Sequence, residues 1–582
     1  MRFAIRFACA LACIALQVHG PAHGAVHYVG AEDDAACEFS DVQSALNHAA
    51  TVPGADVVRL VRTRAYPNQA LVIDDTDDLD LVGGFNSCSD PEGTNALTLL
   101  DGGGGVVNPI VSVHGTGTVR LRALSLYGNN GSGLSVICAC TVELSGMSIR
   151  HNEGAPAVFV GGASPLLRVG PNVGIAFNQA PACAGLHLAN AVLDMRFANG
   201  SRISDNVAEQ DGGGLCLYDA VGSISADVER NGAGRNGGGI AVFGNSVLQL
   251  FPTNASNPPR IASNTAGGRG GGLYVAPLGS GDHPSVTGWD TQFLSNRAHH
   301  GGAIHLANEV AGDTDASLCL RSINALPEAG GECPAGVPDG ALACHPAYSG
   351  CNRLADNVAE YPDSDLGGLG AAVMSLGPRT RVHLSHARLY GNSGWSLLGH
   401  DDGLVPSTAA RIRVDDSLLA RNTLDAFVVF TRFIERITLQ RTTLAGNDAL
   451  PFRLHDFAAF DLHDSVVFEP GHETLVRSGS GGVESIDMVL ASETASLNPS
   501  SSVVQTSDPG FVDPAANDWH LRPGSPAIDF SDHVAGIQDL DGKPRHVALP
   551  GAPDRFGPTD LGAYERQDEG DGIFDDGFEW SP

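Results

Sequence analysis

The chain has 582 residues and carries 34 Lys and Arg against 66 Asp and Glu, a formal net charge of −32 at pH 7. So acidic a surface excludes nucleic acid and anionic membranes as partners. Ten of its twelve Cys follow residue 24, and an even number of Cys in an exported chain indicates disulfides.

Residues 1–24 have the features of a secretory signal. Arg2 and Arg6 precede an apolar run, and small residues end the segment ahead of Ala25. The run is too short to span a bilayer, and no later run of eighteen apolar residues follows, so we expect an exported mature chain without a transmembrane segment. Removing the signal takes away two Arg and changes the charge to 32 − 66 = −34.

Residues 25–100 are expected to form an N-terminal cap and the first coils of the repeat that follows. Ser40 to Gln43 matches a capping box, which predicts a helix over residues 41–50. One face of this helix is apolar, through Val42, Ala45, Leu46 and Ala49. A solenoid has an open end that must be covered, and we expect this helix to cover the first coil.

A short phrase recurs through residues 101–505: an apolar strand pattern, an Asn, and often a Gly-rich turn before another apolar strand. The Asn positions are Asn129, Asn152, Asn178, Asn206, Asn231, Asn264, Asn296, Asn357, Asn392, Asn422 and Asn447. Successive gaps are 23, 26, 28, 25, 33, 32, 61, 35, 30 and 25 residues. All but one fit a single structural unit added once per turn, so the pattern predicts a solenoid.

At six of the Asn, the residues ten, eight and three positions earlier are apolar, apart from Gly288, and alternate with polar ones, which is the period of a strand. Short strands repeated in this way predict an all-β fold, a right-handed parallel β-helix in which Val382, Ile412 and Ile437 stack on successive coils. Strand pairing spaces coils by about 4.8 Å, so roughly fifteen coils would make a rod about 70 Å long. The sequence shows neither the pattern of a leucine-rich horseshoe nor that of a helical repeat.

The Asn column and the Gly runs have structural interpretations. Asn accepts left-handed backbone angles at turns, and its side-chain amide can bond the equivalent amide on the next coil. Gly runs that precede strands, such as Gly301 and Gly302, allow positive φ and close approach of neighbouring coils. We therefore expect a structural Asn ladder rather than a ligand site.

One coil carries a resemblance to a known family. Phe293-Leu-Ser-Asn296 followed by Gly301-Gly-Ala-Ile304 resembles the FxxN and GGAI repeats of the polymorphic outer-membrane proteins. That resemblance implies a right-handed β-helix of the pectin-lyase-like fold. Elsewhere the repeat is degenerate, because Leu or Ile replaces Phe.

The cysteines follow the repeat. We expect Cys37 to pair with Cys88, and Cys183 with Cys216. The single 61-residue gap predicts a Cys-rich insertion near residues 312–352 that is stapled to itself, through Cys319, Cys333, Cys344 and Cys351. Because Cys138-Ala-Cys140 lacks metal-site spacing and no C-x-x-C pair occurs, we predict no zinc site at the cysteines.

Paired carboxylates are the best local candidates for catalysis, because enzymes of the pectin-lyase-like fold use acidic groups to cleave polysaccharides. One pair, Asp401-Asp402, follows His400 in an expected loop, where function is often found. If these residues and His383 converged on a concave face beside a basic residue, the enzyme hypothesis would be strengthened.

The second pair is Asp415-Asp416. Asp416 lies six residues before a repeat Asn, and the same register places His386, Arg441 and Asp464 on neighbouring coils. Alternating charges at stacked positions stabilise a ladder on an outward face. We therefore interpret this column as structural rather than catalytic.

Residues 506–566 contain several fixed points: Asp508 to Phe511, Trp519 to Asp529, Asp539 to Gly542 with Arg545, and Asp560 to Glu565. They resemble the closing segment of bacterial secreted β-helix proteins described as carrying a choice-of-anchor domain, although Phe530 stands where a small residue is usual. The resemblance implies that this segment covers the second open end. Asp539, Asp541 and Asp560 either hold calcium there or form a structural turn, and the sequence leaves both readings open.

Residues 567–582 are expected to form an acidic disordered tail, similar to one seen on secreted proteins of some gammaproteobacteria. Without a complete catalytic set, we expect a non-catalytic surface or extracellular protein, adhesin-like or an interaction scaffold for a surface glycan or protein. The alternative is a polysaccharide lyase or glycoside hydrolase. Calcium is the one cofactor considered, and we expect a monomer outside the cell, held at most peripherally at the outer membrane.

Overall fold

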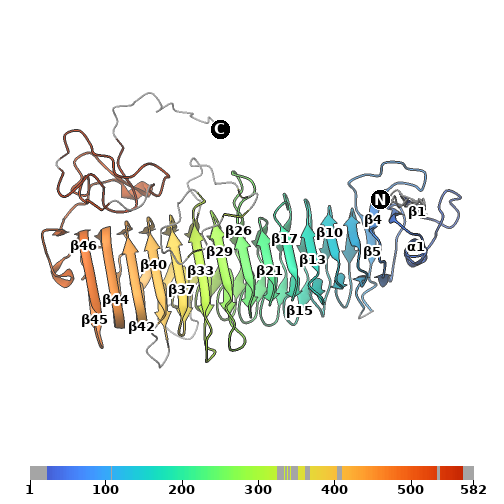
Figure 1. The fold of residues 1–582 in the computed structure, drawn as a ribbon, viewed down its shortest axis with the longest axis horizontal. Coiled ribbons are helices and arrows are strands. Elements are labelled where there is room, and N and C mark those ends of the chain that lie inside the picture. The colour runs from blue at the N-terminus through green and yellow to red at the C-terminus, as the bar shows by residue number, and fades with distance from the viewer. Residues whose placement is uncertain are drawn as a thin grey trace, which may run out of the picture.

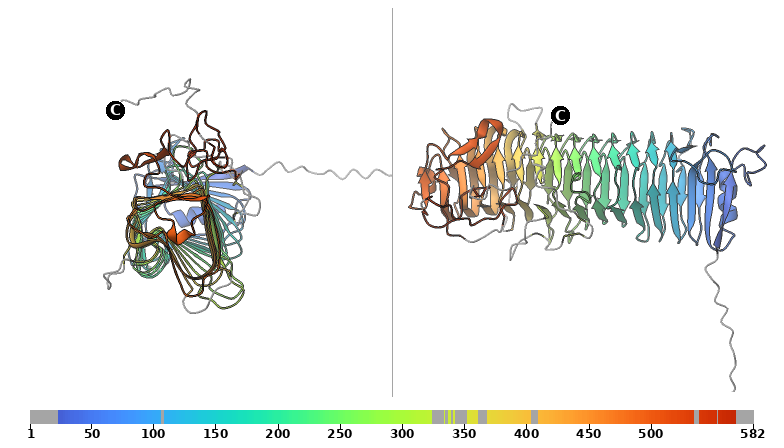
Figure 2. Two further views of the ribbon diagram at one scale, coloured as in Figure 1. Left: turned by 90° about the vertical axis from the view of Figure 1, so that its left-hand side faces the viewer. Right: turned by 90° about the horizontal axis from the view of Figure 1, so that it is seen from above.

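The computed structural model describes residues 23–105, 108–323, 333, 337–338, 341, 352–360, 368–402, 409–533, 538–552 and 554–567. A 47-stranded sheet with parallel pairings winds into a long rod (Figure 1), and the coils superimpose when the rod is viewed from one end (Figure 2). The predicted parallel β-helix is therefore confirmed. The expected signal, apart from its last two residues, and the expected tail beyond residue 567 lie outside the described residues.

Each coil contributes strands to three stacks, which we call stacks 1, 2 and 3 in chain order. Stack 1 contains β1 (His23–Val29), β2 (Ala55–Val61), β4 (Leu79–Phe85), β7 (Thr118–Arg122), β10 (Thr141–Ser145), β13 (Leu166–Val169), β17 (Val192–Met195), β21 (Val221–Ile224), β25 (Val247–Leu250), β29 (Ser285–Trp289), β33 (Ala316–Arg321), β37 (Thr380–Ser385) and β40 (Arg411–Asp415).

Stack 2 follows after a turn. It contains β5 (Thr98–Asp101), β8 (Leu124–Tyr127), β11 (Ser148–Arg150), β14 (Gly174–Ala176), β18 (Arg202–Ser204), β22 (Asp227–Glu229), β26 (Arg260–Ala262), β30 (Gln292–Leu294), β34 (Arg353–Ala355), β38 (Arg388–Tyr390), β41 (Leu418–Ala420), β43 (Thr443–Ala445) and β47 (Val503–Gln505).

Stack 3 closes each coil. It contains β3 (Leu71–Ile73), β6 (Val111–Val113), β9 (Leu134–Ile137), β12 (Val158–Gly161), β16 (Leu186–Ala189), β20 (Leu215–Tyr218), β24 (Ile240–Phe243), β28 (Leu273–Ala276), β32 (Ile304–Ala307), β36 (Val373–Leu376) and β45 (Leu475–Ser478). Two-residue strands lie between stacks 2 and 3: β15 (Gln179–Ala180), β19 (Val207–Ala208), β23 (Gly232–Ala233), β27 (Thr265–Ala266), β31 (Arg297–Ala298) and β35 (Val358–Ala359).

In the last coils the corners straighten, and single long strands serve more than one stack. They are β39 (Ser393–Asp401), β42 (Thr423–Gln440), β44 (Leu450–Phe468) and β46 (Val483–Ala491). The register follows the sequence alignment, because Val382 pairs with Ile412 and Ile412 with Ile437. All three side chains are buried in one core that runs through the rod.

The eleven repeat Asn side chains form a buried ladder. The side-chain Oδ1 of Asn206 accepts from the backbone N–H of Asn178 at 3.2 Å and from its side-chain Nδ2 at 2.8 Å, and similar bonds recur at the following coils. From Asn178 onward, each Nδ2 group also donates to a backbone carbonyl of stack 2, such as that of Ile175. The predicted ladder is confirmed.

The left-handed backbone angle lies one residue earlier than we expected. The residues with positive φ are those directly before each Asn: Gly128, His151, Phe177, Asp205, Arg230, Ser263, Ser295, Asp356, Gly391, Arg421 and Gly446. The Asn itself is not left-handed; it is selected for its side-chain bonds, and the residue before it makes the turn.

The Gly-rich turns have two separate causes. Gly301 has φ +64, which favours Gly, whereas Gly302 would bring a Cβ to 2.6 Å from the carbonyl oxygen of Ala371 on the next coil. Gly270 and Gly271 repeat the same division. Positive φ and close coil approach were both predicted from these runs.

Helix α1 (Val42–Ala49) buries the predicted apolar stripe against the first coils. Its N-cap is Asp41, whose carboxylate accepts from the N–H of Ser44 at 2.7 Å, so the predicted capping box beginning at Ser40 is wrong by one residue. Gln43 instead bonds both the N–H and the carbonyl of Val72 in β3. The helix therefore pairs the free edge of the first coil with a side chain.

Disulfides join Cys37 to Cys88 and Cys183 to Cys216, as expected. Cys319 joins Cys333 within the insertion, and Cys138 joins Cys140, which we did not expect. Cys344 and Cys351 lie outside the described residues. The insertion does not interrupt the rod, because Asn296 bonds Asn357 directly across 61 residues.

Residues 506–566 do not cover the open end, contrary to the expectation. They contain β48 (Phe511–Asp513), the 3-10 turn η2 (Pro514–Ala516) and β49 (Asp518–Leu521), and they pack along the outer face of stack 2 in the last coils (Figure 1). A second 3-10 turn, η1 (Ala495–Leu497), buries Leu497 in the main core after the last long strand. Within the part of the chain that the structure describes, no helix has both the length and the apolar character to cross a membrane.

Candidate functional site

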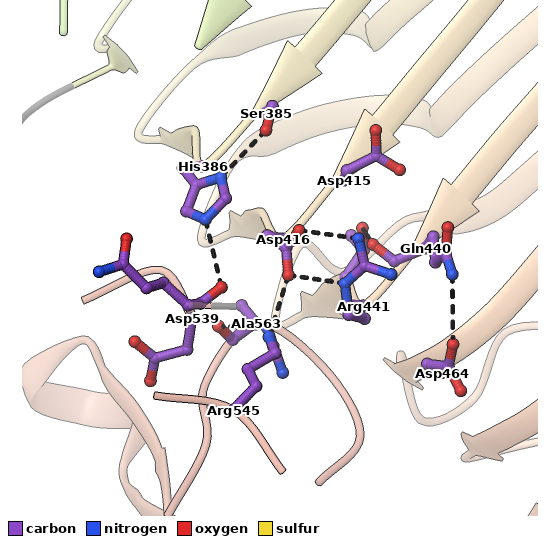
Figure 3. A network of polar contacts seen from close by, with 12 residues as sticks. Ser385, His386, Asp415, Asp416, Gln440, Arg441, Asp464, Asp539, Arg545 and Ala563 are labelled. Atoms are coloured by element: carbon purple, nitrogen blue, oxygen red, sulfur yellow. Dashed lines mark hydrogen bonds and ion pairs between the residues drawn. The ribbon is translucent and has the colours of Figure 1, made fainter. Parts of the chain in front are cut away.

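The Asp415-Asp416 pair lies in a buried ionic network. Asp416 accepts two bonds from Arg441, at 2.8 and 2.9 Å, and is 3.0 Å from Arg545 of the closing segment (Figure 3). Burial alone would raise the pKa of Asp416, but the charges of Arg441 and Arg545 outweigh it and lower this pKa to about 2. A carboxylate held in this way anchors a segment and does not transfer protons.

The predicted column of His386, Asp416, Arg441 and Asp464 does stack, but it is not an open outward ladder. The closing segment covers it, because Ser531 and His533 bond Asp464 at 2.6 and 2.8 Å. This column therefore contributes the polar part of the contact between the rod and the closing segment, while Trp519 and other apolar residues contribute the rest.

Asp415 is also engaged. His383 Nε2 is 2.7 Å from its carboxylate, and Arg413 donates to the same oxygen at 2.5 Å. Burial would raise the pKa of Asp415, but the bonds to His383 and Arg413 lower it below the ordinary range. With both carboxylates of this pair paired to cations, no two-carboxylate catalytic arrangement is present at Asp415-Asp416.

His400 and Asp401 lie in strand β39 and not in a loop, contrary to the prediction. His400 points into the rod, where its Nδ1 is 2.9 Å from the hydroxyl of Ser375, and burial lowers its pKa to about 4. Asp401 pairs with Arg432 on the next coil. His383 lies in stack 1 and His400 in stack 3, so the four residues do not converge on one face.

Asp402 follows the strand directly, and its two carboxylate oxygens are buried without a hydrogen-bond partner. Burial raises the pKa of Asp402 to about 6, and the charge of Asp401 adds to the rise. A buried carboxylate without a partner destabilises the folded protein at neutral pH.

The three carboxylates considered for calcium do not share a site. Asp539 accepts from the backbone N–H groups of Asp541, Lys543 and Glu565, whereas Asp541 pairs with Arg388 and His520. Among the described residues, no cluster of three metal-binding side chains contains any of them. Their donors are protein groups, which fits the structural reading.

A different site lies on the side of the rod, where the turns before stack 3 meet. A hollow of about 570 Å³ is lined by Gly234, Arg235, Asn236, Gly267, Gly268, Arg269, Tyr274, His299, His300 and Glu309. We call this hollow the lateral groove. It crosses successive coils, because the turns that line it follow one another in the pairing of stack 3.

A second polar ladder shapes the lateral groove. The carboxylate of Asp211 accepts from the backbone N–H and the side-chain amide of Asn236, and the side-chain Oδ1 of Asn236 accepts from the N–H of Arg269. On the next coil, His300 Nδ1 accepts from the N–H of Leu369 at 3.2 Å. These bonds hold the turns in register and fix the directions of the lining side chains.

The charges of the lateral groove are partly compensated. Arg269 donates to Glu309 at 2.9 Å, and although burial would lower the pKa of Arg269, its pairing with Glu309 raises it. Burial and then the charge of Arg269 lower the pKa of His300, so its ring is neutral. Exposed Arg235 adds a cation to the same groove.

A row of rings leads along the outer face of stack 3 into the lateral groove. Its members are Phe159, His187, Tyr218, Phe243, Tyr274 and His305, with successive centroids 5.3, 5.1, 4.8, 5.8 and 5.8 Å apart. Burial raises the pKa of Tyr274. His305, which pairs with Tyr274 on the next coil, is 1% exposed, and both of its ring nitrogens lack a partner.

Sequence reasoning missed this groove, although the Asn register contained a signal. Asp211, Asn236 and Arg269 each lie five residues after a repeat Asn, and His300 lies four after one. Reading that column across coils would have found a run of polar residues ending in histidine.

A larger hollow of about 730 Å³ lies within the closing segment. Its two arginines already serve the fold, because Arg555 donates to the carbonyl of Ser501 and Arg566 to that of Leu521. The rest of its lining is mainly Pro, Gly and apolar side chains. The lateral groove is therefore the better candidate for a binding site.

Neither a family model nor a curated protein matches this chain.

Proposed function

We propose that this protein is an exported, non-catalytic β-helix that works outside the cell as a binding scaffold, and that a glycan lies in the lateral groove. The observation that carries the proposal is the lateral groove, where Tyr274 from the row of rings lies among Arg235, Arg269, His300 and Glu309. Sugar rings present apolar faces and a rim of hydroxyls, which suit a groove where the edge of Tyr274, 6% exposed, is bordered by polar groups of both kinds.

Location outside the cell is supported by the disulfides, which persist in oxidising compartments. A rod of stacked coils also presents a long, rigid side surface, as an adhesin-like or interaction scaffold requires. The acidic surface favours ligands that are neutral or that meet a local cationic site such as Arg235.

The alternative is a polysaccharide lyase or glycoside hydrolase. A hydrolase needs two carboxylates across the scissile bond, but Glu309 is the only carboxylate among the described residues that line the groove. A lyase is the stronger form of the alternative, because Arg235 and neutral His300 offer a cation for a uronate and a base. We favour binding, because the other charged groups of the groove, Arg269 and Glu309, are already paired with each other and are not free to take part in a reaction.

Affinity electrophoresis in gels that contain polygalacturonate, alginate or a neutral glucan tests the proposal. We expect retardation in at least one gel, and a loss of about tenfold or more in affinity for Arg235→Ala and Tyr274→Ala. Arg522→Ala, at an exposed ion pair of the closing segment, is the matched control. Binding to none of the glycans, or equal binding by all variants, would refute the groove assignment.

The same glycans are incubated with the protein and followed for new reducing ends and for unsaturated products. We expect none. Turnover that disappears in Arg235→Ala would establish the lyase alternative instead.

A further inference from the structure

Two histidines and one glutamate meet at the N-terminal cap, at the opposite end of the rod from the closing segment. His27 comes from β1, Glu38 from the loop after Cys37, and His48 from the last turn of α1. One ligand atom from each lies within 4.8 Å of the others. Nδ1 of His27 is 3.1 Å from Oε2 of Glu38, and the two imidazole rings are 5.0 Å apart between centroids.

The donor set selects the ion. Two imidazole nitrogens and one carboxylate oxygen suit Zn²⁺ and similar borderline divalent ions, whereas Ca²⁺ and Mg²⁺ prefer oxygen ligands. Bonds of about 2.0–2.2 Å to a tetrahedral ion place its ligand atoms roughly 3.4 Å apart. The contact between His27 and Glu38 already fits that separation, and His48 approaches by side-chain rotation.

Burial fixes the position of the His27 ring. His27 is 3% exposed, and its Nε2 has no hydrogen-bond partner. Buried polar atoms are normally partnered, because leaving one unpaired costs free energy. This unpaired atom is not the Nδ1 that contacts Glu38, so it is the short mutual distances of the three ligand atoms, and not the unpaired nitrogen, that indicate an ion.

The three ligands sit on elements that are fixed by other contacts. His27 lies in a strand paired with β2, and its ring meets Phe39 edge to face at 5.8 Å. The disulfide of Cys37 holds the backbone beside Glu38. The Gln43 bonds to Val72 hold α1, which carries His48. Such supporting contacts keep ligands close to binding geometry before an ion arrives.

We propose that His27, Glu38 and His48 form a zinc site, with water as the fourth ligand, that ties β1 and α1 together over the first coil. The open fourth position follows from the exposure of His48 and Glu38. The site is structural in role, because it joins three cap elements. It does not depend on the lateral groove, and its test does not involve glycans.

Zinc binding to the full mature protein, stripped with EDTA and with its disulfides intact, is measured by titration calorimetry and by thermal unfolding. We expect one saturable site and a rise in Tm with zinc. His48→Ala and Glu38→Gln should each weaken binding about tenfold or more and abolish the rise in Tm. His114→Ala, at another exposed histidine, is the matched control and should bind as the wild type does.

Both replaced side chains reach the surface, so the variants should fold, and their circular dichroism and zinc-free Tm verify this. Co²⁺ in place of zinc should give the visible absorption of a tetrahedral site, lost in His48→Ala. If the wild type takes up no zinc, or if His48→Ala and Glu38→Gln bind it as tightly as the wild type, the proposal is wrong.

Discussion

The side-chain amide of Asn447 donates to the carboxylate of Glu469 at 2.8 Å, and the backbone N–H groups of Asn447 and Asp448 donate to the same carboxylate. The ladder of asparagines ends at this contact. Each earlier Asn finds its acceptor in the next Asn, whereas the last one finds it in a buried Glu. Glu469 therefore terminates the ladder without leaving donors unpaired.

Replacing Glu469 with Ala should lower the free energy of unfolding by about 2–5 kcal/mol, because three buried donors lose their acceptor. Glu469→Gln should cost less, since one acceptor oxygen remains. Guanidinium unfolding followed by circular dichroism measures both, with Glu153→Ala at an exposed position as control. Equal losses for the Ala and Gln variants would contradict the role of the acceptor.

Gly446 and Gly128 precede repeat asparagines with nearly the same backbone, φ +67 and +71, but only Gly446 faces the closing segment. A Cβ at Gly446 would lie 2.8 Å from the ring of Trp519, whereas one at Gly128 meets only a side-chain oxygen at 3.4 Å. We expect Gly446→Ala to cost about 1–3 kcal/mol more than Gly128→Ala. The difference between the Tm values of the two variants isolates the contact with Trp519. Equal Tm values would show that the closing segment packs elsewhere.

Acid should detach the closing segment. The pKa of Asp416 is about 2 in the folded protein, below its ordinary value of 3.8, so its contribution is present above pH 4 and is lost as the pH falls through 2. Asp416→Asn, which removes the buried carboxylate shared by Arg441 and Arg545, should have a similar effect at pH 7 and cost roughly 3–5 kcal/mol.

Limited proteolysis with mass spectrometry should then cut within residues 506–566 of Asp416→Asn at neutral pH, while the rod stays intact. Arg522→Ala removes an exposed ion pair from the same segment and should stay resistant. Equal resistance of Asp416→Asn would show that apolar packing alone holds the segment.

Asp402 should have the opposite pH dependence. Its pKa of about 6 lies above the ordinary 3.8, so the folded protein keeps a proton that the unfolded chain releases. Stability from this group is therefore highest below pH 4 and declines as the pH rises through 6. Asp402→Asn should remove that decline and raise Tm at pH 7, measured from pH 4 to 8. An unchanged pH profile would refute the assignment to Asp402.

The fold could be predicted because each coil is short, so that the spacing of the repeat Asn gives the register between neighbouring coils. Alignment on the Asn column placed Val382 over Ile412 correctly, since a slip of one residue would turn every apolar side chain outward. The αL turn could not be assigned from residue type, because left-handed angles fall on residues as different as Phe177 and Arg230. The Asn is chosen for bonds that only the neighbouring coil supplies.

Neither the position of the closing segment nor the lateral groove could be predicted from local sequence patterns. The charged column at Asp416 was read as solvated, since nothing in its own coil indicates that Arg545, far along the chain, would cover it. The cap cluster of His27, Glu38 and His48 likewise joins residues whose spacing matches no metal motif. Sites formed by residues that are far apart in the sequence can be found only from the three-dimensional structure.

The bond from Asn296 to Asn357 spans the insertion as if the intervening segment were absent. A coil therefore needs only a neighbouring coil whose strands and Asn match its own, and the number of residues that connect the two coils can vary. Such a chain can lengthen by duplicating whole turns, or acquire new loops at a corner, while its centre is undisturbed. Size and surface are in that sense separately adjustable properties of the molecule.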